Sequence, residues 1–290
     1  MSISASQVKS LRERTGAGMM ECKKALVESG GDLEAAVEAL RKSGLAKADK
    51  KADRVAAEGV IVQASAGGRS VLVEINSETD FVAKDDNFRT FADQVATAAA
   101  GLDSEDVSDL NEASLESGDT VEQARQQLVG KVGENVQVRR IVSLTEENGV
   151  VGSYIHGGRI GVLLGLQGGD EDLARDLAMH VAALNPEFLD ADGVPADFLE
   201  KEKSILRAQA EGSGKPPEIV EKMIAGRLNK RLAEITLVGQ PFVKDGDITV
   251  GKLLDQHKAG ISGFVRLEVG EGIEKKEEDF AAEVMQQAKG

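Results

Sequence analysis

Apolar side chains recur every three or four positions across residues 8–40, a spacing that places them on one face of a helix. The pattern predicts three short helices. Their apolar positions are Val8 and Leu11, then Met19, Cys22, Ala25 and Leu26, then Leu33, Ala36, Val37 and Leu40. Asp32, which follows a Gly-Gly pair, is the predicted N-cap of the third helix. Residues 47–54, rich in Lys, Ala and Asp, are predicted to be a solvated linker. So small a bundle suits docking rather than catalysis.

The pattern changes to short strands at residue 59 and then repeats with an offset of 90 residues. Residues 59–60 correspond to 149–150, and the Gly-Gly-Arg run at 67–69 corresponds to the one at 157–159. Each copy is therefore predicted to be a hairpin that turns at its Gly-Gly pair. A helix is predicted after each hairpin, over 88–100 and 171–184, and a further strand near the end of each copy, over 136–142 and 264–269.

The two predicted helices align with an offset of only 86, so the first copy carries four extra residues between strand and helix. These lie within residues 77–87, around Phe81, which is one of only eight Phe in the chain. One interpretation is that Asp80 caps a helical turn while Phe81 packs onto Phe88 or Phe91. The other is that Phe81 is presented to a partner as a wedge. The lengthened loop in one copy of a duplicated unit favours an added function.

Helical spacing returns over residues 195–236 and predicts a helical hairpin, and residues 280–287 predict a short terminal helix. The expected fold class is α+β with antiparallel sheets. The expected domains are a three-helix head and linker (1–54), a first α+β unit (55–145), a second unit that includes the hairpin (146–270), and a C-terminal helical module (271–290).

Charge and composition narrow the function. The 290-residue chain has a net charge of −15, although residues 1–54 carry eleven Lys and Arg against eight Asp and Glu. The acidic balance argues against sequence-independent binding to nucleic acid. The start of the chain lacks the features of a signal peptide, and no apolar run is long enough to cross a bilayer. We therefore expect a cytoplasmic protein with no membrane partner.

Cofactor chemistry finds little support in the sequence. A single cysteine, Cys22, and three scattered histidines predict neither an internal disulfide nor a metal site. The Gly-Ser-Gly-Lys run at 212–215 has Gln209 and Pro216 where a phosphate-binding loop needs Gly and Ser or Thr, so it is predicted to be a plain turn. We expect no cofactor and no direct nucleotide binding. His156, at a hairpin tip, is a candidate contact, and His180 is expected at the core edge or the surface.

The run Glu-Ile-Asn-Ser-Glu-Thr-Asp-Phe-Val-Ala-Lys at residues 74–84 resembles the signature of the elongation factor Ts family, the bacterial nucleotide exchange factors for elongation factor Tu. Further segments resemble the family in the same order, at residues 11–26, 131–135, 156–162, 239–243 and 279–284. The departures are residues 102–120, which look longer and more acidic than usual, and the sequence of the helical hairpin.

This resemblance implies a ubiquitin-associated-like head, two related α+β units, a coiled-coil-like hairpin and a C-terminal helix. It implies that the element matching Thr79, Asp80, Phe81 and Val82 inserts into the GTPase domain of elongation factor Tu and displaces its magnesium ion. Further contacts with this partner are implied for Arg12, Met19, Met20, Val132, Gly133, His156 and Phe280. The implied activity is nucleotide exchange, in which GDP leaves and GTP reloads. No covalent bond changes, so no catalytic residue and no enzyme are expected.

Two other functional classes remain open at the level of the sequence. The head is compatible with a general peptide-binding adaptor, and a hydrolase built around His156 and nearby acids is the weaker alternative. The oligomeric state is open as well, because a two-fold contact through the hairpin or a sheet face would give a homodimer or a two-to-two complex.

Overall fold

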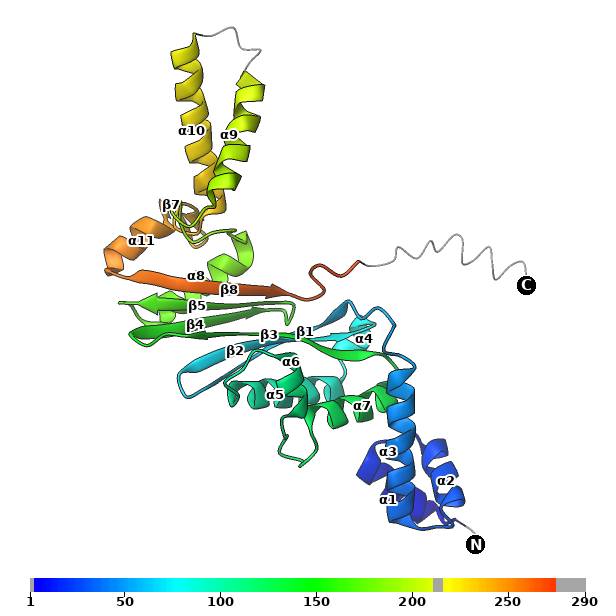
Figure 1. Cartoon of the computed structure of the whole chain (residues 1–290). Helices are drawn as coiled ribbons and strands as arrows, with labels where there is room; N and C mark the ends of the chain where they lie inside the picture. Colours follow the sequence, from blue (N-terminus) through cyan, green and yellow to red (C-terminus); the bar gives the residue numbers. More distant parts are fainter. Residues whose placement is uncertain (1–2, 211–215, 275–290) are drawn as a thin grey trace, which may run out of the picture.

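The structure, a computed structural model, describes residues 3–210 and 216–274 of the chain (Figure 1). The predicted turn at 212–215, the predicted terminal helix over 280–287 and its Phe280 lie outside the described residues.

Three helices form the head: α1 (Ala5–Thr15), α2 (Met19–Glu28) and α3 (Leu33–Asp49). Their shared core contains Val8, Leu11, Cys22, Ala25, Leu26 and Ala36. Asp32 caps α3 as predicted, since its carboxylate accepts hydrogen bonds from the N–H groups of Glu34 and Ala35.

The linker prediction is wrong at its start, because α3 continues to Asp49. Ala48 is buried in the core of the first α+β unit, and α3 packs against α7 (Val121–Val132). The two helices approach closely at a pair of glycines: a Cβ added to Gly130 would lie 3.5 Å from the Cα of Gly44. Tertiary packing therefore extends the helix into a segment whose composition suggested a linker.

An antiparallel sheet in the order β1-β2-β3 forms the centre of the first unit. Its strands are β1 (Glu58–Ala66), β2 (Arg69–Ser77) and β3 (Val136–Thr145). The first hairpin turns at Gly67 and Gly68, which have φ values of +57° and +83° that suit glycine. The helices α5 (Asp86–Ala100), α6 (Val107–Glu112) and α7 lie together on one side of this sheet (Figure 1).

The second unit repeats this plan with a sheet in the order β4-β5-β8. Its strands are β4 (Gly149–His156), β5 (Ile160–Gln167) and β8 (Gly260–Glu268), and α8 (Glu171–Leu184) packs on β4 and β5. Between α8 and β8 the chain forms further elements: α9 (Ala196–Ala210), α10 (Pro217–Ile235), β6 (Pro241–Phe242), β7 (Asp245–Thr249) and α11 (Val250–His257). Figure 1 shows α9 and α10 side by side, projecting away from the sheet. The observed α+β class with antiparallel sheets agrees with the sequence prediction.

The two sheets pack face to face through an apolar cluster of Ile61, Leu72, Leu163, Leu267 and Val269. Gly161 permits this approach, because a Cβ at that position would lie 2.5 Å from Cγ2 of Ile61. A backbone hydrogen bond also crosses between the units, from the N–H of Ile61 to the carbonyl of Gly158 at 2.7 Å. The core thus has four layers, with helices outside two stacked sheets (Figure 1).

A buried carboxylate joins the two units. Glu74, on β2, is fully buried and accepts hydrogen bonds from Nη1 of Arg139 at 3.0 Å, from Nε of Arg140 and from the N–H of Gly270 at 2.8 Å. Burial alone would raise the pKa of this carboxyl, but the hydrogen bonds from Gly270, Asn76 and Arg140 outweigh burial and lower it. Glu74 therefore links β2 and β3 to the segment that follows β8.

Candidate functional site

The extra residues of the first copy form the one-turn helix α4 (Asp80–Ala83), between β2 and α5. Thr79 is its N-cap, and the Thr79 side chain accepts a hydrogen bond from the N–H of Val82 at 3.4 Å. Val82 and Ala83 are buried in the core of the first unit, whereas the side chain of Phe81 is 81% exposed. This single helical turn is thus anchored by two buried residues and presents Phe81 outward.

The alternative interpretation of this loop is wrong. Phe88 and Phe91 are buried in the core on the inner side of α5, and Phe81 is not among the residues of that core. The N-cap of the turn is Thr79 rather than Asp80. The aromatic ring is therefore presented to solvent, as the wedge interpretation expects.

Asp80 lies beside the exposed ring. Its Oδ2 pairs with Nζ of Lys84 at 2.6 Å, and this hydrogen bond holds the pKa of the Asp80 carboxyl below its usual range. The tip of α4 consequently combines an apolar ring with an ionised, paired carboxylate.

Glu134 holds the start of α4, a role that the sequence analysis missed. Its carboxylate accepts hydrogen bonds from the N–H of Thr79 at 2.9 Å and from Oγ1 of Thr79 at 2.7 Å. The residue lies just after the end of α7, where Val132 is half-buried and Gly133 is the C-cap with φ of +80°. The structure therefore brings the predicted residues Val132 and Gly133 next to the loop that carries Phe81. The only signal in the sequence was the position of Glu134 within the matching segment 131–135.

His156 lies at the exposed end of β4. Its ring stacks on Tyr154 with centroids 6.1 Å apart, and its Nδ1 lies 3.2 Å from the Tyr154 hydroxyl. The turn after it reaches β1, because Arg159 forms an ion pair with Glu58 at 2.6 Å. Glu58 pairs with Ser77 across the β1-β2 ladder, and Ser77 leads into α4. The tip of the second hairpin and the Phe81 loop thus belong to the same end of the stacked sheets.

The remaining predicted contacts are in the head. Arg12 is exposed on α1, and Met19 and Met20 are 59% and 75% exposed on α2. Exposed thioether side chains make a surface suited to protein docking.

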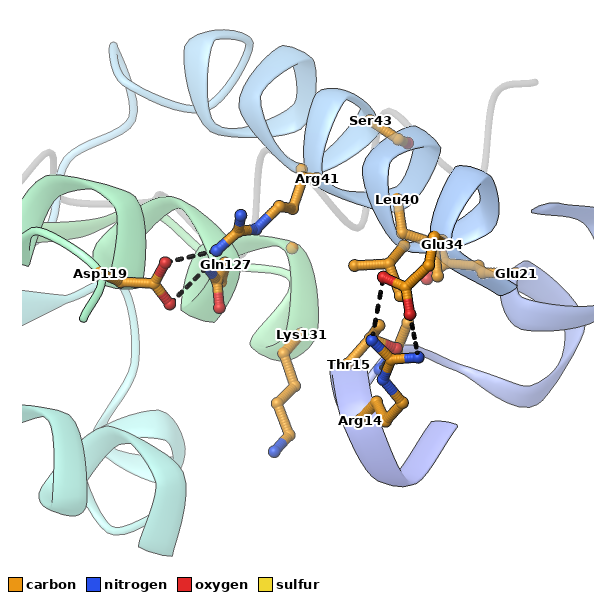
Figure 2. Close-up of a pocket in the computed structure, with 14 residues that line it drawn as sticks. Arg14, Thr15, Glu21, Glu34, Leu40, Arg41, Ser43, Asp119, Gln127 and Lys131 are labelled. Carbon is orange, nitrogen blue, oxygen red and sulfur yellow. Dashed lines mark hydrogen bonds and ion pairs between the residues drawn. The ribbon is translucent and has the colours of Figure 1, made fainter. Parts of the chain in front are cut away.

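A pocket of about 360 Å³ lies between the head and the first unit (Figure 2). Figure 2 shows the ion pair between Arg41 on α3 and Asp119, which also accepts a hydrogen bond from Gln127 on α7 at 3.1 Å. On the head side, Arg14 pairs with Glu34 at 2.8 Å. Asp119 belongs to the acidic segment 102–120, and so that segment helps to hold the head against the core. The same segment places Leu110 and Leu115 in the core of the first unit.

His180 is fully buried, and the expectation that it lies at the core edge or the surface is wrong. Its Nδ1 accepts a hydrogen bond from the N–H of Val243 at 3.1 Å, so its Nε2 carries the proton that is donated to Oε1 of Gln240 at 3.0 Å. The pKa of this imidazole is lowered, because burial lowers it more than the hydrogen bond with Gln240 raises it. These contacts give the matching segment 239–243 a structural role.

The described residues contain no group of three or more His, Cys, Asp and Glu side chains that could hold a metal ion. Over the same parts of the chain, no helix is both long and apolar enough to span a membrane.

Comparison with known proteins gives consistent matches. The model of the family described as Elongation factor TS matches residues 78–271. The elongation factor Ts of Alcanivorax borkumensis is 60% identical over 285 residues, covering 98% of this chain and 100% of that protein. The elongation factor Ts of Xanthomonas campestris pv. campestris is 59% identical over 99% of both chains, and that of Alkalilimnicola ehrlichii is 60% identical over 100% of both.

Proposed function

Because the chain belongs to the elongation factor Ts family, we propose that this translation elongation factor is a guanine nucleotide exchange factor for elongation factor Tu. It binds the GDP form of elongation factor Tu in the cytoplasm, perturbs the magnesium and phosphate site, and promotes GDP release and GTP reloading. The chain itself binds neither nucleotide nor cofactor.

The observation that carries this proposal is the exposure of Phe81 on a short helix that is anchored by the buried residues Val82 and Ala83. In the proposed mechanism, Phe81 separates elements of the GTPase that hold the magnesium ion. Magnesium screens the diphosphate and ties it to its protein, so loss of the ion weakens GDP binding. The coupling is reciprocal, and incoming GTP in turn weakens the binding of the exchange factor.

The other proposed contacts fix the position of the wedge on its partner. Thr79, Asp80 and Val82 are proposed to contact elongation factor Tu together with Phe81. The further contacts are Arg12, Met19 and Met20 in the head, Val132, Gly133 and His156 in the core, and Phe280 beyond the described residues.

No covalent bond is made or broken in this mechanism, and the chain is therefore proposed not to be an enzyme. The Nδ1 of His156 lies 3.2 Å from the hydroxyl of Tyr154, a partner that is not a carboxylate, and this arrangement does not favour the alternative of a hydrolase. The exposed methionines of the head are assigned to docking on elongation factor Tu rather than to a separate adaptor function.

The test is the release of fluorescent GDP from purified elongation factor Tu, followed by stopped flow at a fixed magnesium concentration. Strong acceleration by this protein, reduced in Asp80 or Phe81 variants, supports the proposal. A stable complex without acceleration would instead favour a binding adaptor. Light scattering of the same complex distinguishes one-to-one from two-to-two stoichiometry.

A further inference from the structure

We propose that Glu134 is a positioning residue for Phe81, and that it acts by clamping Thr79 at the start of α4. This inference rests on the proposed exchange function, because it concerns how the wedge is held in its working orientation. Glu134 itself need not touch the partner.

Every polar group of Thr79 is hydrogen-bonded, and Glu134 holds two of them. Glu134 accepts hydrogen bonds from the N–H and from Oγ1 of Thr79, at 2.9 and 2.7 Å. The carbonyl of Thr79 accepts from the Ser77 hydroxyl at 2.9 Å and from the N–H of Ala83 at 3.3 Å. A carboxylate that binds two donors of one residue fixes orientation as well as distance.

A second carboxylate completes the clamp in the opposite direction. Oε1 of Glu78 accepts a hydrogen bond from the N–H of Asn135 at 2.6 Å. Residues 78 and 79 therefore exchange contacts with residues 134 and 135. The Asn135 side chain is buried, and its Nδ2 donates to the carbonyls of Ala52 and Arg54 at 3.2 and 2.7 Å. The segment that leads from the head into β1 is thus hydrogen-bonded to Asn135, next to the residue that holds the start of α4.

The clamp matters because α4 cannot hold itself. A single helical turn is unstable in isolation. The exposed ring of Phe81 also lies outside the core that buries Val82 and Ala83. The orientation of the ring is therefore set by the burial of Val82 and Ala83 and by the hydrogen bonds of Thr79. Loosening Thr79 lowers the fraction of bound complexes in which the ring is aligned, so it slows the step after binding more than binding itself.

The experiment compares Glu134→Ala with a matched control, Glu105→Ala. The Glu105 carboxylate also binds the N–H, at 2.8 Å, and the hydroxyl of one residue, Ser143 on β3. We expect Glu134→Ala to lower the maximal rate of GDP release from elongation factor Tu about tenfold, with little change in the half-saturating concentration. Glu105→Ala is expected to leave both quantities unchanged. Glu134→Gln, which can still accept from the Thr79 N–H and donate to its Oγ1, is expected to recover most of the rate.

A second measurement needs no partner. Hydrogen exchange of the Val82 and Ala83 amides, followed by NMR on the full chain alone, is expected to be faster in Glu134→Ala and unchanged in Glu105→Ala. A maximal rate and amide protection equal to the wild type in Glu134→Ala would overturn the inference. So would equal losses in both variants, which would indicate a general loss of stability.

Failure of the wild-type protein to accelerate GDP release would refute the proposed function, whereas the amide measurement would still decide whether Glu134 clamps α4.

Discussion

At the scale of single residues, Phe81 and His180 illustrate two opposite environments for a ring. Phe81 is exposed at the tip of α4 even though the two residues that follow it, Val82 and Ala83, are buried. His180 is fully buried, and both of its ring nitrogens have hydrogen-bond partners. The first ring is available to a partner protein, and the second is part of the core.

Replacing Phe81 with Ala tests the wedge directly. We expect Phe81→Ala to retain most of its affinity for elongation factor Tu, because the head and the core still dock. GDP release is expected to slow by about tenfold or more, because insertion of the ring contributes about 1.5–3 kcal/mol and each 1.4 kcal/mol is about a factor of ten in rate. Stopped-flow release and binding titrations measure the two effects. Leu184→Ala, at an exposed apolar residue on α8, serves as the control. Parallel loss of binding and exchange in Phe81→Ala would contradict the wedge role.

The buried imidazole of His180 makes stability depend on pH. Burial lowers its pKa in the folded protein below the ordinary value of about 6.5, so the unfolded chain takes up the proton first as pH falls. The contribution of His180 is therefore complete above about pH 6.5 and is lost as pH falls from there through the folded-state pKa. Urea denaturation at a series of pH values measures this loss. A profile without a slope below pH 6.5 would contradict the assignment.

At the scale of elements, the packing of α8 on β4 depends on Gly152. A Cβ at this position would lie 2.4 Å from the backbone carbonyl carbon and oxygen of Ala174. We expect Gly152→Ala to lower the free energy of unfolding by about 2–3 kcal/mol, because strand and helix must separate. Gly263→Ala is the matched control on β8, where an added Cβ meets nothing within 4 Å. Chemical denaturation compares the two variants, and equal stabilities would show that the helix does not need the glycine.

The sequence predicted elements well where local signals were strong. Both Gly-Gly hairpins were found, and the predicted helix over 171–184 has the observed bounds. The strand β8 begins at Gly260, earlier than predicted, because its pairing with β5 includes a Gly-Ile-Ser-Gly run with weak strand propensity. The end of α3 was misjudged for a related reason, since only tertiary packing of Ala48 reveals it.

The candidate site was predicted in part. The exposed ring of Phe81 was visible as an extra aromatic in one copy of a repeat. The contact between Glu134 and Thr79 spans 55 residues, and that between His180 and Gln240 spans 60, so no local pattern identifies either pair. Long-range polar contacts of this kind follow from the fold and not from periodicity.

At the scale of the whole molecule, Glu74 fastens the two units together. We expect Glu74→Ala to lower the free energy of unfolding by about 3 kcal/mol, because Arg139 and Arg140 lose a buried partner. Glu58→Ala removes the more exposed inter-unit ion pair with Arg159 and is expected to cost less than about 1 kcal/mol. Urea denaturation of both variants checks the comparison, and similar losses would argue against a special role for Glu74.

The same carboxylate predicts acid sensitivity. The pKa of Glu74 is lower in the folded protein than its ordinary value, so the unfolded chain binds this proton first as pH falls. Its stabilising contribution is complete above about pH 4.5 and is lost as pH falls through the folded-state pKa. Thermal unfolding of the wild type and Glu74→Gln between pH 6 and pH 3 is expected to show that the difference between them narrows with acidification. A constant difference would contradict this prediction.

The solvent exposure of Phe81 also limits how much work one ring can do. Moving a Phe side chain from water into an apolar site is favourable by about 1.5–3 kcal/mol. Each 1.4 kcal/mol corresponds to about a factor of ten in an equilibrium constant. Insertion of this ring alone can therefore lower the affinity of elongation factor Tu for GDP by no more than about a hundredfold. In the proposed mechanism, any larger effect must draw on binding energy from surfaces far from the wedge, which gives a mechanical reason for joining the head and the two stacked sheets in one chain.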